Sequence, residues 1–283
     1  LTRATVALRT EATLSEAALE APVLELVVGT PEGDAFQLNG KLSRSLAPNP
    51  PLTLVGNFTA SSNRLSARWF PGGLVTAQGE VNVTLRGPML ELQPGRVQLL
   101  QAGKALFDAS ILQAANVDLA KHILTPHDPA QPVARVTLGK LPLALLPVTG
   151  PGAALGGFVE QGAFEVSVRE GRTLVNTLRP LRLVDVSLTQ DRRLALTGLA
   201  IEASPQFEYG GPEDYRVQSG DVTIRTAGVG SLLTMKAETS EAPGQGGQAT
   251  ATFALEVPAL ASQPLFAEAQ PLSAGKATGE IRA

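Results

Sequence analysis

The sequence contains no cysteine, and only 4% of its 283 residues are aromatic. Without cysteine the chain cannot form a disulfide, a thiolate nucleophile or a cysteine-ligated zinc site. Proteins that bind nucleic acid usually carry aromatic faces and excess positive charge. Here 23 Lys and Arg residues stand against 26 Asp and Glu, giving a formal net charge of -3 without charge runs. These scarcities argue against a nucleic-acid partner and disfavour a carbohydrate binder.

Histidine is also scarce. The sequence contains only His122 and His127, and Asp128 follows the second of them. The segment is rich in proline and offers no fourth ligand nearby, so we predict a solvated loop, not a metal site. A Ser-His-Asp triad would need one of these histidines, and no Gly-x-Ser-x-Gly motif supplies its nucleophile. We therefore expect no enzyme activity, no catalytic residue, no metal and no cofactor.

Two glycine-rich or apolar stretches imitate known motifs. Gly150, Gly152 and Gly156 approach a dinucleotide-binding fingerprint, but a strand pattern follows where a helix is required, which predicts a turn. Residues 141–159 carry no charge, yet their prolines and glycines exclude a helix that spans a membrane. Trp69 is the only tryptophan, and its alternation with neighbouring apolar residues favours packing over a ligand platform.

Alternation of apolar and polar residues with a period of two dominates the chain, which predicts strands with one buried face. Between residues 181 and 188 the alternation changes phase, so that Val184, Val186 and Leu188 are predicted to face the other side. Turn signals rich in Gly and Pro recur about every ten residues, as in an antiparallel meander. The predicted fold is all-β: many short strands in an extended antiparallel meander, forming an open, twisted, groove-like sheet with one or two short helices.

Helices are predicted only in short pieces, at residues 15–20, 112–123, 141–146 and 259–269. We divide the chain into a β-strand repeat segment at 1–130 and a second at 131–283, continuous with the first. The absence of an initiator methionine leads us to expect a piece of a longer envelope protein, whose targeting signal or inner-membrane anchor lies outside these residues.

A loose internal repeat connects residues 138–168 with residues 255–283. In both, a strand runs into a short segment of Leu and Pro, a loop follows, and a new strand begins around glycine. The segments Leu141-Pro142-Leu143 with Leu155-Gly156-Gly157, and Leu272-Ser273-Ala274-Gly275, resemble the repeats of the AsmA-like and TamB-like envelope proteins of Gram-negative bacteria. The likeness covers about a third of the chain, at 133–203 and 248–283.

The resemblance implies an open β-sheet groove in the periplasm, lined by aliphatic side chains, that holds phospholipid acyl chains between two membranes. It also implies a role in phospholipid transport or outer-membrane biogenesis, with other envelope or membrane proteins as partners. Acyl chains gain about 0.8 kcal/mol for each CH₂ group that they bury. The lining predicted from alternation comprises Val81, Val83, Leu85, Val97, Leu99, Val166 and Leu196. The alternative is a structural or adhesive β-repeat protein of the cell surface, whose own side chains fill the apolar interior.

Overall fold

The structure is a computed structural model that describes residues 4–31, 33–46, 48–63, 66, 70, 73–145, 152–211, 214–226, 230–240, 248–266 and 274–282. Strands make up 74% of the chain and helices 6%. Neighbouring strands pair in antiparallel fashion from one end of the sequence to the other. The prediction of an all-β antiparallel meander is therefore confirmed.

The chain divides into two compact units. The first unit comprises residues 1–136 and 165–173, and the second comprises residues 137–164 and 174–283. The sequence analysis placed its boundary between residues 130 and 131. The structure divides a few residues later, and it assigns the tip of one later hairpin to the first unit.

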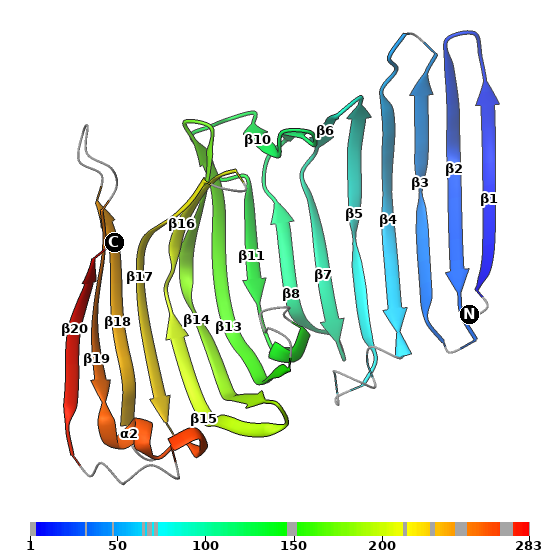
Figure 1. Cartoon of the computed structure of the whole chain (residues 1–283). Coiled ribbons are helices and arrows are strands. Elements are labelled where there is room, and N and C mark those ends of the chain that lie inside the picture. Colours follow the sequence, from blue (N-terminus) through cyan, green and yellow to red (C-terminus); the bar gives the residue numbers. More distant parts are fainter. Residues whose placement is uncertain are drawn as a thin grey trace. The chain divides into compact units, whose positions relative to one another are not determined.

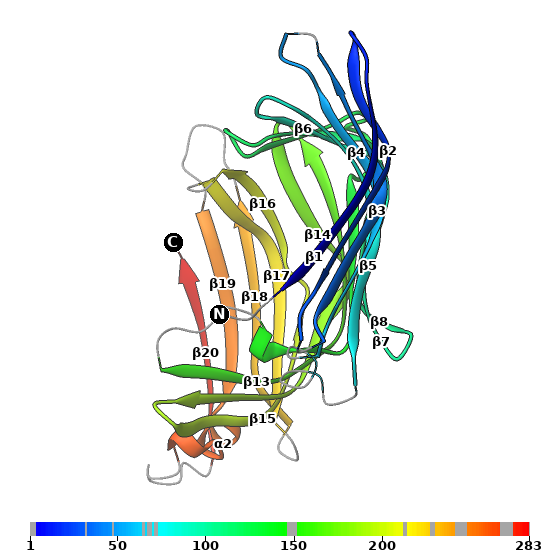
Figure 2. The ribbon, with the colours of Figure 1, turned by 90° about the vertical axis from the view of Figure 1, so that its right-hand side faces the viewer.

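The first unit is built from strands that mostly pair with their neighbours in sequence (Figure 1). They are β1 (Thr5–Leu14), β2 (Ala18–Gly29), β3 (Ala35–Ser45), β4 (Leu52–Ser62), β5 (Val75–Arg86), β6 (Met89–Leu92), β7 (Gly95–Gln101), β8 (Lys104–Ile111), β9 (Ala115–Asp118), β10 (Ile123–Pro126) and the start of β11 (Ala134–Leu138). One half of β5 pairs with β7, and the other half pairs with the short strand β6, which continues to β9 and β10. In Figure 2 the strands β1 to β5 are seen nearly edge-on and follow one twisted layer.

The second unit has longer strands and the short helical segments. Its elements are β12 (Leu141–Pro142), the 3₁₀ turn η1 (Leu143–Leu145), β13 (Ala153–Arg169), β14 (Arg172–Gln190), β15 (Arg193–Ala203), β16 (Gln206–Gly211), β17 (Asp214–Thr226), β18 (Gly230–Ser240), β19 (Gln248–Glu256), α2 (Val257–Ala261), the 3₁₀ turn η2 (Pro264–Phe266) and β20 (Lys276–Arg282). The hairpin tip between β13 and β14 belongs to the first unit. Strand β15 pairs with both β14 and β17, and β17 also pairs with β16 and β18.

The register of the first unit sorts its residues into two chemically different faces. Residues directly opposite each other in antiparallel strands point to the same face of a sheet. One row across seven strands consists of Leu8, Leu26, Leu38, Phe58, Gly79, Val97 and Ala109. The adjacent row on the opposite face consists of Ala7, Val27, Gln37, Thr59, Gln78, Gln98 and Asp108. The first unit is therefore a single sheet layer with one apolar face and one largely polar face.

The second unit shows the same division. One row runs through Leu183, Ile201, Ile224, Leu233, Leu255 and Ala277, and a parallel row runs through Leu181, Ala203, Val222, Met235, Phe253 and Gly279. The face on the other side carries Arg182, Glu202, Thr223, Thr234, Ala254 and Thr278. Ion pairs from Arg225 to Glu202 and from Lys276 to Glu256 lie on that polar side.

Bulges keep the apolar residues of β13, β14 and β15 on one side. Asp185 has φ 53° and Gly198 has φ 64°, and the pairing of β14 with β15 shifts register between Leu183 and Val186. An extra residue in one strand reverses the alternation beyond it. Val186 consequently packs in the same cluster as Leu183, so the prediction that it faces the other side is wrong.

Gly157 lies beside this bulge, with φ 103°. A Cβ atom there would lie 2.7 Å from the carbonyl oxygens of Val184 and Asp185. Only glycine combines this positive φ with so close an approach of two backbones. Figure 2 shows the lower ends of β13 and β15 turning sideways.

A buried cluster of six residues lies in the second unit, where the two helical segments meet the apolar face. Its buried members are Leu143, Val159, Val186, Leu199, Leu232 and Ala259. Leu143 comes from η1 and Ala259 from α2, so the two segments of the sequence repeat contribute to one cluster. In Figure 1, α2 lies at the foot of β18 and β19. A smaller cluster in the first unit joins Ala115, Val133 and Val168.

The predicted helices are partly correct. The segments at 141–146 and 259–269 contain η1 and α2 with η2, although residues 146 and 267–269 lie outside the described residues. The segments at 15–20 and 112–123 are not helical. In the first, the Ser15 hydroxyl accepts a hydrogen bond from the Ala18 N–H at 3.0 Å, which closes a turn ahead of β2. In the second, β9 pairs with β6 and β10, so its residues satisfy their backbone groups by sheet pairing.

Gly40 and Gly56 lie directly opposite each other on β3 and β4. A Cβ atom on Gly56 would lie 2.4 Å from the Asn39 carbonyl oxygen and 2.8 Å from the Gly40 Cα. Both are backbone atoms, which cannot move aside as the end of a side chain can. The two strands can therefore approach this closely only with glycine at both positions.

Replacing Gly56 with alanine is expected to lower the free energy of unfolding by about 1–3 kcal/mol, because the new methyl group overpacks this contact. Gly29→Ala is the matched control, since its Cβ would meet only the Asp34 carbonyl oxygen at 4.0 Å. Urea denaturation followed by circular dichroism measures both variants. Equal midpoints for the two would contradict the close approach.

Candidate functional site

Five of the seven residues predicted as lining lie on the apolar face of the first unit. Val81, Val83 and Leu85 alternate along β5. Val97 and Leu99 lie on β7, opposite Gly79 and Ala77 of β5, so they share the face of Val81. All except Val97 are half-buried, and Val97 is exposed. The sequence alternation therefore identified residues that the register brings together.

The other two predicted residues lie elsewhere. Val166 belongs to the part of β13 in the first unit, where its carbonyl accepts a hydrogen bond of 2.7 Å from the Val133 N–H. Leu196 lies on β15 in the second unit, opposite Leu188, and packs against the large cluster. These two are therefore not part of the five-residue group on β5 and β7.

The apolar faces are far less covered than the interior of a globular protein. The chain has a solvent-accessible surface of 17535 Å². Two separate compact proteins of half its 29.4 kDa mass would together expose about 14,000 Å². Among the described residues, only Leu143 and Val159 are large side chains with less than 2% exposure. Much of the aliphatic surface is thus accessible, which is unusual because monomers rarely expose large continuous apolar patches.

Aromatic side chains cover glycines on both apolar faces. A Cβ on Gly79 would lie 2.8 Å from the ring of Phe58, its partner across the strands. In the second unit, Phe253 stands over Gly279 in the same way. An aromatic ring over a glycine replaces the missing side chain and stabilises the pairing. In each pair the ring occupies the space that a side chain at the glycine would need.

One end of the second unit's apolar face is covered by the protein itself. Ala259 of α2 and Leu143 of η1 pack there, and α2 is followed by Gln263, which is 3% exposed. The Gln263 Oε1 accepts a hydrogen bond of 2.9 Å from the Thr197 N–H. Thr197 adjoins the bulge at Gly198, so this bond satisfies a backbone donor that sheet pairing leaves free.

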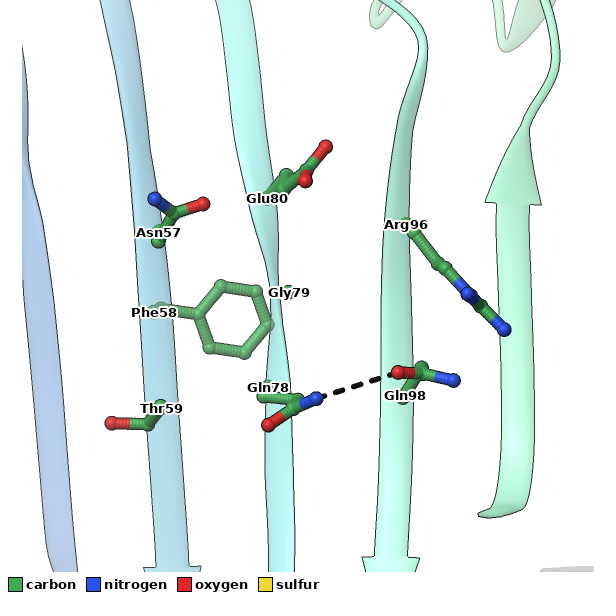
Figure 3. A pocket seen from close by; sticks show the side chains of 8 residues that line it. All are labelled: Asn57, Phe58, Thr59, Gln78, Gly79, Glu80, Arg96 and Gln98. Carbon is green, nitrogen blue, oxygen red and sulfur yellow. Dashed lines mark hydrogen bonds between the residues drawn. The ribbon is translucent and has the colours of Figure 1, made fainter.

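The first unit carries a shallow depression of about 340 Å³, lined mainly by residues of the polar rows. Figure 3 shows its lining, which is Asn57, Phe58, Thr59, Gln78, Gly79, Glu80, Arg96 and Gln98. The Gln78 amide donates to Gln98 at 3.4 Å, and Gln98 donates to Asp108 at 2.9 Å. The polar groups of β5, β7 and β8 therefore bond largely to one another, as a cross-strand ladder does.

Arg96 and Asp108 form an ion pair within this ladder. The Arg96 Nε donates to Asp108 Oδ1 at 2.9 Å, and the Arg96 NH2 group also bonds to Asp108 Oδ2. The hydrogen bond from Arg96 is the main cause that holds the pKa of Asp108 below its ordinary value, and the bond from Gln98 adds to it. The same pair raises the pKa of Arg96.

The histidines and glycines singled out in the sequence analysis lie in turns, bends or strands where they are described. His122 has φ 57° in the turn between β9 and β10, and the His127 N–H donates to the Ala114 carbonyl at 3.0 Å. No group of three His, Cys, Asp or Glu side chains suited to a metal occurs among the described residues. Gly152 precedes β13 and Gly156 lies within it. Gly150 and Trp69 lie outside the described residues.

No helix in the part of the chain that the structure describes combines the length and apolar character needed to cross a membrane.

Sequence reasoning missed most of the apolar face in the second unit. Its rows include Ile224, Leu233, Met235, Phe253 and Leu255, none of which was named as lining. These residues alternate with polar ones, so the same period-two signal could have found them. The covering role of α2 needed the three-dimensional structure.

Comparisons with protein-family models, with curated proteins and with solved structures found no match.

The stability of the Asp108→Asn variant is expected to fall less than that of the wild type as the pH is lowered. A carboxyl whose pKa is lowered in the folded protein stabilises it above the unfolded pKa of about 4, and this contribution disappears as the pH falls through the folded pKa. The variant should therefore be less stable than the wild type near neutral pH. Below pH 4 its stability should fall less steeply with pH than that of the wild type. Melting temperatures between about pH 2 and pH 7 test this, with Glu80→Gln on the same face as the control. If the melting temperature of Asp108→Asn depended on pH as that of the wild type does, the Arg96–Asp108 pair would not contribute to stability as described.

Proposed function

We propose that this chain is a segment of a bacterial envelope protein that binds phospholipid acyl chains along its apolar sheet faces. In this proposal it serves intermembrane phospholipid transport or outer-membrane biogenesis, works in the periplasm together with other envelope or membrane proteins, and performs no catalysis. The single observation that carries the proposal is the extended apolar face of the first unit, on which every strand from β1 to β8 presents aliphatic or aromatic side chains.

The chemistry of that face suits a long hydrocarbon chain. Beside the row through Leu8 and Phe58 runs a second row of Val6, Val28, Phe36, Ala60, Ala77, Leu99 and Phe107. These side chains contain no hydrogen-bonding group, so they favour any acyl chain over polar ligands without selecting one structure. Each CH₂ group that leaves water contributes about 0.8 kcal/mol, which over one acyl chain is enough for reversible binding.

The packing supports the lipid proposal over a closed structural repeat. A solenoid fills its interior with its own side chains, each repeat resting on the next. Here the two faces of one layer differ in polarity, and Leu14 on the apolar face is 71% exposed. Self-filling is local: it occurs in the clusters around Leu143 and around Ala115 and at a few other buried residues, such as Phe70, Val75 and Leu106. A bound apolar ligand would supply the missing second layer.

The test combines native mass spectrometry of the purified chain with extraction and identification of bound lipid. We expect phospholipid in stoichiometric amounts with the wild type. Val83→Asp together with Leu99→Asp should abolish it, because each charge would have to be buried beneath hydrocarbon.

The matched control is Asn82→Asp together with Thr76→Asp, which adds the same two charges to the polar face of β5. It should retain the lipid of the wild type. Circular dichroism verifies that both double variants are folded. A wild-type protein that carries no lipid and ignores added fluorescent phospholipid would overturn the proposal in favour of a structural repeat protein.

A further inference from the structure

One cation interrupts the apolar face of the first unit, and it lies at the ends of the strands. The pairings connect a row of eight residues across the sheet: Leu14, Leu19, Arg44, Leu52, Leu85, Leu90, Val117 and Leu124. Seven of these are aliphatic, and the third is Arg44. It lies directly between Leu19 of β2 and Leu52 of β4, close to the end of β3 at Ser45.

Arg44 is exposed, and within the described part of the chain the structure records no ion pair or hydrogen bond for its side chain. Three other arginines, Arg96, Arg135 and Arg182, each pair with a carboxylate. A guanidinium group beside leucines and without an acidic partner has unused donors, arranged in a fork that matches a phosphate.

The next residues along the strands form the apolar floor beside Arg44. Leu42, Leu54 and Val83 lie in the adjoining row, followed by the Gly40–Gly56 pair, and then by Leu38 and Phe58. The acyl chains of one leaflet extend for about 15 Å, half the hydrocarbon thickness of a bilayer. Along a strand this corresponds to about five residues. Chains that start at Arg44 would thus cover the floor past the Gly40–Gly56 pair and end just before the row of Phe58.

From this juxtaposition we propose that Arg44 binds the phosphate of a phospholipid whose acyl chains lie over Leu42 and Leu54 and point toward Phe58. The inference rests on the proposed lipid function and adds two properties to it. The headgroup end of the lipid is fixed at the strand ends near Ser45, and anionic lipids, which carry a net negative charge, are preferred over uncharged ones.

The experiment compares dioctanoyl phosphatidylglycerol with dioctanoylglycerol, which has the same chains but no phosphate, by isothermal titration calorimetry below their micellar concentrations. The wild type should bind the phosphatidylglycerol more tightly. Arg44→Gln should weaken that binding by about fivefold, the upper end for an exposed ion pair, and leave dioctanoylglycerol binding unchanged. Arg44→Lys should retain much of the preference, because it keeps the charge but loses the fork.

Lys41→Gln is the matched control, because Lys41 is an exposed cation on the same strand but on the polar face, opposite Val55. It should bind both lipids as the wild type does. Glycerol 3-phosphate, which has the phosphate without the chains, should show no binding; tight binding of it would identify a free-phosphate site and overturn the inference.

The outcomes separate the two proposals. If Arg44→Gln keeps the wild-type preference for phosphatidylglycerol, the inference is wrong while lipid binding stands. If the folded wild type binds neither lipid, both the inference and the proposed lipid function are wrong. Equal melting temperatures of the two glutamine variants would establish that a difference in binding does not come from unfolding.

Discussion

Alternation of apolar and polar residues in antiparallel strands is the constraint on which both units depend. Because directly paired residues point the same way, alternation that stays in phase across a ladder gathers the apolar residues on one side. In the first unit the phase holds from Val6 on β1 to Phe107 on β8. A single layer ordered in this way lacks the second layer that buries an apolar face in most domains. The exposed aliphatic surface thus follows directly from the pairing.

Where the alternation changes phase, a bulge in the backbone keeps the apolar residues on the same face. The sequence around Asp185 changes phase, and an alternation-based prediction therefore sends Val186 to the wrong side. In the structure the bulge there, accommodated by Gly157 on the neighbouring strand, returns Val186 to the cluster with Leu183. The cost is a residue with positive φ that is not glycine. The continuity of the apolar face is maintained by such local departures from regular pairing.

Sequence reasoning succeeded where the information is local. The period of two along β5 and β7 was sufficient to predict strands and to group Val83 with Leu99. It failed where the information depends on register between distant residues. Alternation along β3 places Arg44 on the same face as Leu42, but its position between Leu19 and Leu52 follows only from the pairing of β3 with β2 and β4. The helix predicted at 112–123 failed for the same reason, because pairing with β6 decides the outcome.

The meander has a consequence for how such a chain changes in evolution. Most strands bond to the strand that precedes or follows them, as β2, β3 and β4 do, so inserting or deleting one hairpin leaves the pairing of the others intact. Each added hairpin would bring its own stripe of aliphatic residues, provided that its alternation starts in phase. The apolar face can therefore become wider or narrower by two strands at a time, through duplication or loss of the coding sequence for a hairpin, while the fold stays the same.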